Sequence, residues 1–324
     1  MVTIMKKIHR FLLFLTIAFA FSACGRQGAA EHRELLLATG PAGGGYYAIG
    51  PIIAEALMAA VGNLTVTTVP SGGSVANPPL LGSGEVDLAL TNYYSAWNAF
   101  HGVGAYRGTG RIPLVGIANL QYSILHLVVS ADSDIYSVAD LRGRRVNVGP
   151  SGGAGAMLFN MMIPFWDLSM QDIHIYNVAP AVGAQMIRDG ELDVNVPHGA
   201  PPLGAVSNLA GLHDVRILNL EEEILLQILE LYPYYDIAYI QAGTYVGIDA
   251  PVRSLGIQDI LTVRQDMDEE LAYQIARGLY ESQDFLRRAH PALAGMSFDG
   301  FGHSLVRLHP GALRFYRERG ISLE

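Results

Sequence analysis

Short apolar runs alternate with amphipathic stretches along most of the chain. Residues 35–39 form an apolar run, a glycine-rich turn follows, and residues 46–61 place apolar side chains at helical spacing. Residues 64–69 and 88–91 are two further short runs, with a helical stretch between them. Strands that alternate with helices predict an α/β fold with mainly parallel sheets that helices cover on both faces.

The same order of elements returns in the middle of the chain. Residues 145–163 predict a strand, a glycine loop and a helix, and residues 174–196 predict a strand, a helix and a strand. The helix within the later segment ends in Gly-Glu-Leu-Asp at 190–193, which matches Gly-Glu-Val-Asp at 84–87. In both places a glycine stops the helix and a strand follows. Two copies of the unit predict two lobes.

The first lobe is expected to hold residues 34–122 and to recover the carboxyl-terminal helices, residues 257–324. The second lobe is expected to hold residues 123–256. The chain then crosses between the lobes twice, which makes a hinge. A ligand is expected in the central cleft, where the strand ends of the two lobes face each other.

Glycine-rich loops lie between a strand and a helix in both lobes. Backbone N–H groups are unpaired at a helix start and the helix dipole is positive there, so such loops bind carboxylate or phosphate. Thr39, Ser71, Ser74 and Ser151 offer hydroxyl donors beside them. Each loop by itself is equally well explained as a tight turn. Three such loops in two facing lobes favour a binding site.

The amino terminus has the pattern of an export signal. Lys6, Lys7 and Arg10 precede an uncharged run, residues 11–23, that is too short to span a bilayer as a stable helix. We therefore interpret residues 1–23 as a signal peptide.

Small residues before a single cysteine, Ser22-Ala23-Cys24, resemble the lipobox of bacterial lipoproteins. The resemblance implies cleavage before Cys24 and diacylation of its thiol, which is sufficient to hold a protein at a membrane. Residues 24–33 are then a flexible tether, and the protein lies in the periplasm or at the extracytoplasmic face of the cell membrane. The alternative is an ordinary buried thiol. No second cysteine exists, so disulfides are excluded.

Charge and motif spacing exclude several classes of function. The formal net charge of −9 includes three positive residues of the signal peptide, so the mature chain carries about −12; this argues against nucleic acid or anionic lipid as a partner. The glycine loops lack the spacing of dinucleotide and nucleoside-triphosphate sites. The ten histidines have neither metal-site spacing nor cysteine partners. We expect no cofactor and no metal.

One enzyme signature is present. Residues 149–153 fit G-x-S-x-G between a predicted strand and helix, which is the context of the nucleophile elbow of α/β-hydrolases, with Ser151 as nucleophile. His290, His303 or His309 follows in the required chain order. The pattern is short and no Asp and His pair stands out as its partners. An exported serine hydrolase is therefore the alternative to a binding protein without catalysis.

Further motifs follow one another through the mature chain. They are Thr39-Gly40, Gly45-Tyr46-Tyr47-Ala48-Ile49-Gly50, Ser71-Gly72-Gly73-Ser74-Val75-Ala76-Asn77, Gly84-Glu85-Val86-Asp87-Leu88-Ala89, Ala139-Asp140-Leu141-Arg142-Gly143-Arg144-Arg145-Val146, Gly243-Thr244-Tyr245-Val246-Gly247 and Leu308-His309-Pro310-Gly311-Ala312-Leu313-Arg314-Phe315-Tyr316. Together they resemble the TAXI family of TRAP transporter solute-binding proteins. The resemblance implies a periplasmic-binding-protein type II fold whose two lobes close on a small solute and deliver it to integral membrane TRAP permease subunits.

The resemblance also implies the ligand class and its contacts. Family members with known ligands bind glutamate-like amino acids or dicarboxylates. Matching positions give these ligand-binding residues: Gly45, Tyr47, Ser71, Gly73, Ser74, Val75, Asn92, Tyr93, Tyr122, Gly152, Gly153, Ala154, Gly155, Ala156, Gly199 and Pro201.

The second-lobe loop departs from the family pattern. Where members usually show Gly-Ser-Gly-Thr, residues 152–156 contain no hydroxyl, so a more apolar organic acid is a further candidate ligand. We expect a monomer that binds a small carboxylate for a transporter. A receptor for a sensor kinase uses the same fold and is a second alternative.

Overall fold

The computed structural model describes residues 32–296, 298 and 306–322. The predicted signal peptide and Cys24, together with most of the predicted tether, lie outside these residues. Residues 34–324 form one compact unit. Within the described ranges, none of the helices combines the length and the apolar character needed to cross a bilayer.

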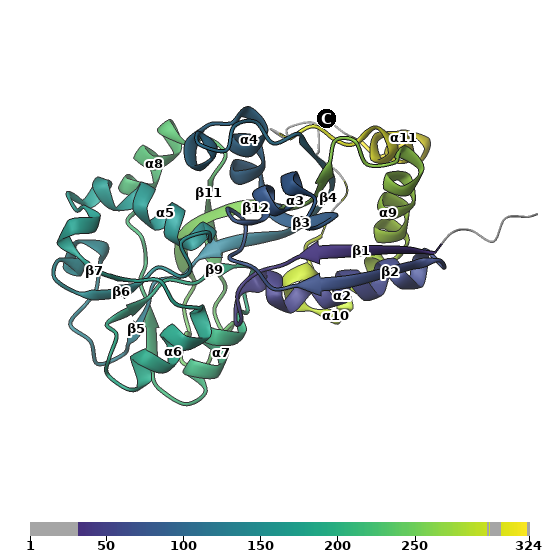
Figure 1. Cartoon of the computed structure of the whole chain (residues 1–324). Coiled ribbons are helices and arrows are strands. Elements are labelled where there is room, and N and C mark those ends of the chain that lie inside the picture. The colour runs from purple at the N-terminus through teal and green to yellow at the C-terminus, as the bar shows by residue number, and fades with distance from the viewer. Residues whose placement is uncertain (1–31, 297, 299–305, 323–324) are drawn as a thin grey trace, which may run out of the picture. The chain divides into compact units, whose positions relative to one another are not determined.

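Helices and strands alternate along this unit, as the hydrophobic pattern predicts (Figure 1). In chain order they are β1 (Arg33–Ala38), α2 (Gly45–Ala60), β2 (Leu64–Val69), α3 (Asn77–Ser83), β3 (Leu88–Asn92), α4 (Tyr93–His101), β4 (Leu114–Leu125), β5 (Val128–Ser130), β6 (Arg145–Asn147), α5 (Ala154–Met162), β7 (His174–Tyr176), α6 (Pro180–Arg188), β8 (Val194–Asn195), β9 (His198–Gly199), α7 (Gly204–Ala210), β10 (Val215–Ile217), α8 (Glu222–Leu231), β11 (Asp236–Ile240), β12 (Val252–Arg264), α9 (Glu269–Glu281), α10 (Gln283–Ala289) and α11 (Pro310–Glu318).

The matched turns stop their helices as expected. Gly84 follows α3 with φ 77°, and Gly190 follows α6 with φ 74°. This left-handed backbone is readily adopted only by glycine, so the chain leaves each helix at that residue and enters the next strand, β3 or β8. The repeated unit read from the sequence is confirmed.

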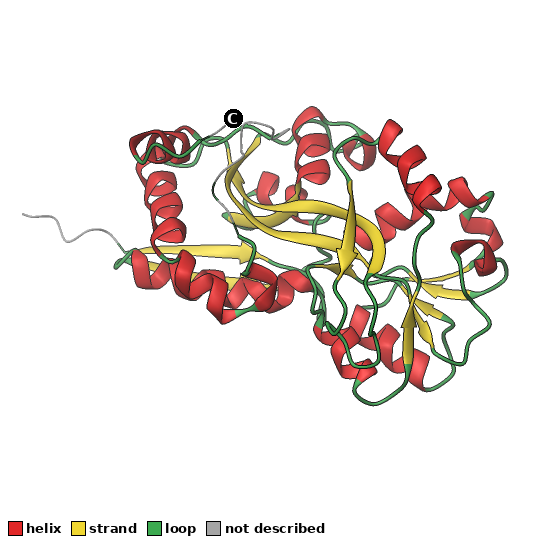
Figure 2. Ribbon diagram, turned by 180° about the vertical axis from the view of Figure 1, so that it is seen from behind, coloured by secondary structure: helices red, strands yellow, loops and turns green. Residues whose placement is uncertain are grey.

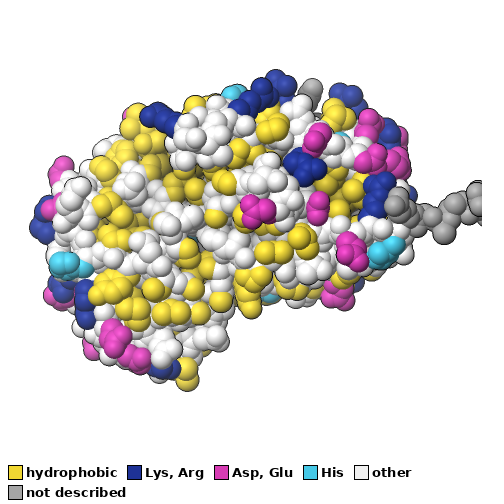
Figure 3. All heavy atoms as spheres, viewed as in Figure 1, with side chains coloured by type: hydrophobic (Ala, Val, Ile, Leu, Met, Phe, Trp, Pro, Cys, Tyr) yellow, Lys and Arg dark blue, Asp and Glu magenta, His cyan; other side chains and the backbone are white. Residues whose placement is uncertain are grey.

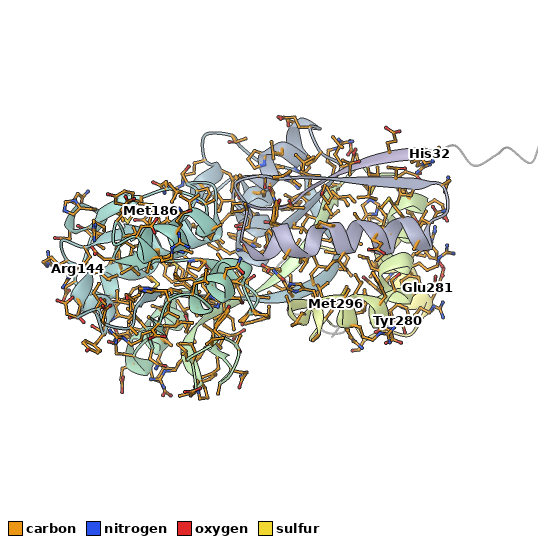
Figure 4. All side chains as sticks on the ribbon, turned by 90° about the horizontal axis from the view of Figure 1, so that it is seen from below. His32, Arg144, Met186, Tyr280, Glu281 and Met296 are labelled. Carbon is orange, nitrogen blue, oxygen red and sulfur yellow. The ribbon has the colours of Figure 1, made fainter. Side chains whose placement is uncertain are left out.

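The strands form two sheets, one in each lobe. The order of the larger sheet is β2-β1-β3-β12-β4-β9, with β11 also paired to β12; that of the smaller is β10-β5-β8-β6-β7. The two sheets occupy different halves of the unit in Figure 1. Figure 4 labels Arg144 and Met186 in the half with the smaller sheet, and Tyr280, Glu281 and Met296 in the other half. The predicted two-lobed α/β architecture is confirmed.

The sheets are mixed, which corrects the prediction that they are mainly parallel. The pairs β1–β3, β6–β7 and β6–β8 are parallel, but β12 runs antiparallel to β3, β4 and β11. The reason is the long strand β4, which leads into the smaller sheet, and the long strand β12, which returns from it. Such strands run in opposite directions and pair side by side (Figure 2).

Both predicted crossing points, 122/123 and 256/257, fall inside these two continuous strands. In addition, β9 and β11 come from the predicted second-lobe segment but pair with the larger sheet. The division of the chain into lobes at those residues stays a prediction.

Apolar side chains fill both faces of the larger sheet. Leu37 packs in one core with Ile53 of α2, Ile275 of α9 and Phe315 of α11. Its neighbour Ala38 belongs to a separate core with residues of α3 and α4, as the alternation of side chains along a strand requires. Helices therefore cover both faces of this sheet. Only the loops at the ends of its strands are left free to contact a ligand.

Candidate functional site

Loops from the two lobes meet around a small central cavity. The first lobe contributes Pro41, the start of α2, the loop 72–74 and Ser123 of β4. The second lobe and β9 contribute the turn 148–150, the start of α5, Pro180 and residues 196–198. The cavity encloses about 50 Å³, room for only a few water molecules. The loops are thus closed on each other.

A pair of hydrogen bonds, here called the clasp, holds the two loops together. The backbone N–H groups of Val75 and Ala76 both donate to the carbonyl oxygen of Gly152, at 3.0 and 2.8 Å. The contact is close enough that a Cβ on Gly152 would lie 2.7 Å from the Cβ of Ala76. Glycine at 152 is required for this approach, because such a Cβ contact is essentially never seen.

Two helices begin at the cavity without a side-chain cap. The N-cap residues of α2 and α5 are Gly44 and Gly153, and neither start receives a side-chain hydrogen bond. Among the described helices, Asn92 caps α4, Asp268 caps α9 and His309 caps α11. The starts of α3, α6, α7, α8 and α10 also lack a side-chain cap, so it is the N–H groups that they place at the cavity that single out α2 and α5. The first N–H groups of α2 and α5 are therefore donors that an anionic group in the cavity can take up.

A fully buried acid, Asp259, lies next to the cavity wall. Tyr46 donates its hydroxyl to Asp259 Oδ1 at 2.6 Å, Gln121 donates Nε2 to Oδ2 at 3.0 Å, and Ser123 donates its hydroxyl to the same oxygen. Burial raises the pKa of Asp259 to about 7, although the three hydrogen bonds favour the charged form. The carboxyl group therefore ionises near neutral pH.

His198 is a titratable side chain of the cavity wall itself. Burial lowers its pKa to about 4, so the imidazole is neutral at pH 7. Its Nε2 is buried and has no hydrogen-bond partner in the part of the chain that the structure describes. A buried polar atom without a partner costs free energy, and a hydrogen bond from a bound solute would recover it. None of the described residues in the wall of this cavity is an arginine.

Six of the sequence-predicted ligand residues line the cavity: Gly45, Gly73, Ser74, Gly153, Ala154 and Gly155. Others lie directly behind them. Val75 and Gly152 form the clasp. A Cβ on Gly199 would lie 3.1 Å from the nitrogen of Gly45.

Two further predicted residues support the loops from behind. Ser71 donates its hydroxyl to Asn77 Oδ1 at 2.6 Å, and Asn92 donates Nδ2 to Ser74 Oγ at 3.3 Å. That any of these residues contacts a solute stays a prediction.

The remaining predicted residues do not line this cavity. Tyr47 is 47% exposed, and Ala156 and Pro201 are not part of its wall. Tyr93 and Tyr122 line a different cavity. That Tyr47, Tyr93 or Tyr122 contacts a solute stays a prediction, because the motif match does not contain the direction in which each side chain points.

Sequence reasoning missed three polar residues at this site: Ser123, His198 and Asp259. The sequence does contain an indication of Asp259, because this residue is a lone acid within the apolar run 255–263. A charged residue inside an apolar strand is rarely buried unless it is hydrogen-bonded or functional. His198 and Ser123 had no comparable signal.

The surroundings of Ser151 do not form a hydrolase site. Ser151 is exposed in the turn before α5. The ring of His290 accepts a hydrogen bond from Ala292 N, and that of His309 accepts one from Gly311 N. Within the described part of the chain no histidine or carboxylate is hydrogen-bonded to Ser151, while His303 lies outside it. The geometry gives the hydrolase alternative no support.

The chain is similar to several known proteins. Similar solved structures include the alkanesulfonate-binding protein SsuA of Xanthomonas axonopodis pv. citri bound to MOPS (15% identity, TM-score 0.49, 91% of this chain and 82% of that chain). Others are the periplasmic aliphatic sulphonate binding protein SsuA of Escherichia coli (14%, 0.47, 89% and 88%) and a putative L-cystine ABC transporter protein of Listeria monocytogenes (12%, 0.49, 81% and 97%). The NMT1-like family model matches residues 37–320. The chain belongs to the NMT1-like family.

Proposed function

We propose that this protein is an extracytoplasmic solute-binding protein that captures a small carboxylate for a transporter and carries out no chemistry on it. The observation that carries the proposal is the cavity where uncapped starts of α2 and α5, from different lobes, face each other. Each start offers unpaired N–H groups and the positive end of a helix dipole. A carboxylate that binds both helix starts contacts both lobes and stabilises their closed arrangement.

The wall of the cavity favours a small, mostly apolar acid. Backbone amides, the Ser74 hydroxyl and the neutral ring of His198 are its polar groups, and Val148, Pro150 and Val196 are apolar. Because the described wall contains no arginine, only the two helix starts stabilise the negative charge of one carboxylate. A dicarboxylate would place its second charge toward Asp259 or the apolar groups. We therefore favour a monocarboxylate over a dicarboxylate.

Capture then depends on closure of the lobes. A solute bound to both helix starts stabilises the closed arrangement with its clasp, and the equilibrium shifts by the difference in solute affinity between the closed and open states. Release to the transporter requires the reverse movement about β4 and β12, the strands that connect the lobes.

The transporter and the location rest on sequence patterns. The TAXI-like motifs favour TRAP permease subunits as the partner, and the pattern up to Cys24 favours a lipid anchor. Such an anchor raises the effective concentration of the protein near a permease. A Cys24→Ser variant should leave the membrane fraction and appear in the soluble extracytoplasmic fraction. An unchanged distribution would rule out the anchor.

Isothermal titration calorimetry with a panel of amino acids, monocarboxylates and dicarboxylates tests the binding function. We expect one-to-one binding of a monocarboxylate and weaker binding by Ser74→Ala, whose hydroxyl is lost from the wall. Ser207→Ala, on α7 away from the cavity, is the matched control and should bind as wild type. If no member of the panel binds or raises the unfolding temperature, the proposal fails.

A further inference from the structure

A second cavity lies where α4 meets the chain between α8 and β11. Its wall includes Tyr93 and Trp97 of α4, Tyr122 of β4, Tyr234, Asp236 of β11 and Gln258 of β12. We call it the hinge cavity because β4 and β12 connect the two sheets. It is partly open to solvent and has a volume of about 610 Å³, which is within the range of small-molecule sites.

The hinge cavity and the central cavity use opposite faces of the same two strands. On β4, Tyr122 lines the hinge cavity and its neighbour Ser123 lines the central cavity. On β12, Gln258 lines the hinge cavity, whereas Asp259 bonds to Tyr46 and Ser123 of the central wall. Because successive side chains of a strand point to opposite faces, the β4–β12 ribbon separates the cavities.

Aromatic rings make up most of the wall of the hinge cavity. Two of its four rings are held in place from outside: the Tyr93 hydroxyl donates to Asn119 Oδ1 at 2.5 Å, and Tyr234 stacks on Tyr94 with ring centroids 4.9 Å apart. Rings that are already fixed lose little further conformational entropy when a ligand binds. The faces of aromatic rings attract organic cations.

One carboxylate supplies a full negative charge at this wall. Tyr122 donates its hydroxyl to Asp236 Oδ2 at 2.6 Å, which orients the group. Asp236 is exposed, and among the described residues it forms no ion pair. Among the described residues, no lysine, arginine or histidine lines the hinge cavity. Figure 3 shows extensive apolar surface on the face that it displays, with many charged side chains toward its edges.

We propose that the hinge cavity binds a small organic cation of the alkylammonium class, held by the faces of Tyr93, Trp97, Tyr122 and Tyr234 and by the charge of Asp236. A neutral aromatic compound would use the rings but leave the carboxylate without a counter-charge, and an organic anion would be repelled by it. The charge preference is therefore the reverse of that of the central cavity.

Trp97 fluorescence in a Trp166→Phe background tests the proposal. The chain has two tryptophans. Trp166 bonds to Glu221 and is not among the residues that line the hinge cavity, so its replacement leaves Trp97 as the sole reporter. The probe is choline chloride, titrated at constant ionic strength. The comparison compound is 3,3-dimethylbutan-1-ol, which has the same shape without the charge. We expect saturable quenching by choline, and at least roughly tenfold weaker binding of the alcohol.

Two charge variants identify the carboxylate. Asp236→Asn should weaken choline binding roughly tenfold, because it keeps the shape and removes the charge. Asp249→Asn removes an exposed charge outside the wall of the hinge cavity and is the matched control; it should bind as the background protein does. Equal binding of alcohol and choline, or unchanged choline binding by Asp236→Asn, overturns the proposal. So does the absence of choline binding in calorimetry of the full wild-type chain.

Carboxylate binding in the central cavity and cation binding in the hinge cavity can each be disproved without the other. Carboxylate binding by Asp236→Asn should equal that of wild type, since the central cavity is untouched. Loss of choline binding in Ser74→Ala would show instead that one cavity serves both ligands, and would overturn the assignment of the cation to the hinge cavity.

Discussion

The two cavities differ in chemistry although adjacent residues of two strands build them. The central cavity is walled by backbone amides, small residues and a neutral histidine. The hinge cavity is walled by aromatic rings and one exposed carboxylate. Tyr122 and Ser123 are consecutive, yet each belongs to a different environment. A β-ribbon between lobes thus gives two surfaces of opposite charge preference, and each can be changed without the other.

A variant that opens the clasp should change the carboxylate affinity of the central cavity most, while it leaves the choline affinity of the hinge cavity unchanged. In Gly152→Ala the new Cβ collides with Ala76 at 2.7 Å, and overpacking of this kind costs about 1–3 kcal/mol. We expect the affinity for the carboxylate that binds wild type to fall by roughly 5- to 150-fold, with choline affinity unchanged. Calorimetry measures both, and small-angle scattering should show a larger radius of gyration.

Gly204→Ala is the control for this change, because a Cβ at the start of α7 meets no atom within 4 Å. Full carboxylate affinity in Gly152→Ala would mean that the clasp is not part of the bound state.

Replacement of the buried acid should reduce stability and alter its pH dependence. Asp259→Asn leaves one acceptor oxygen for three donors, at a cost of about 1–3 kcal/mol. In wild type, the folded-state pKa of Asp259 is about 7 against an ordinary value of 3.8. The folded state therefore binds more protons between these values, and the contribution of Asp259 to stability falls as pH rises through that window.

Urea unfolding at several pH values measures this effect. The stability advantage of wild type over Asp259→Asn should be greatest near pH 4, shrink up to about pH 7 and stay constant above it. An advantage that grows with pH would mean that the carboxylate is stabilised in its charged form.

Loss of one hydroxyl should affect the hinge cavity alone. Tyr122→Phe removes the hydrogen bond to Asp236 and keeps the ring. We expect choline binding to weaken roughly 2- to 10-fold, from about 0.5–1.5 kcal/mol for the lost bond. Carboxylate affinity should not change in calorimetry, whereas the motif resemblance predicts that it falls. This variant therefore separates the sequence-based assignment of Tyr122 from the structural one.

The smallest effect is expected at Tyr47. The ring is 47% exposed and is not part of either wall, and exposed substitutions usually cost within about 0.5 kcal/mol. Tyr47→Ala should therefore keep both affinities within roughly twofold. A large loss of carboxylate binding would favour the contact implied by the motifs over the arrangement in the structure.

Much of the fold was predictable because its signals are local. β2 occupies residues 64–69 as the apolar run predicts, and Gly84 and Gly190 end their helices because each adopts a positive φ. Part of the central cavity was predictable for the same reason, since Gly45 and residues 153–155 lie at helix starts that the sequence marks with glycine.

The sequence by itself determined the alternation of strands and helices, the glycine loops at the helix starts and membership of the NMT1-like family. Only the tertiary structure decided which side chains meet. Tyr46 and Asp259 are 213 positions apart, and the β4–β12 register shifts between Gln258 and Ile260. Hydrophobic periodicity reports which residues are buried, but long-range pairing and such an irregularity set the face to which each side chain points. For that reason Tyr122 faces the hinge cavity and Ser123 the central one.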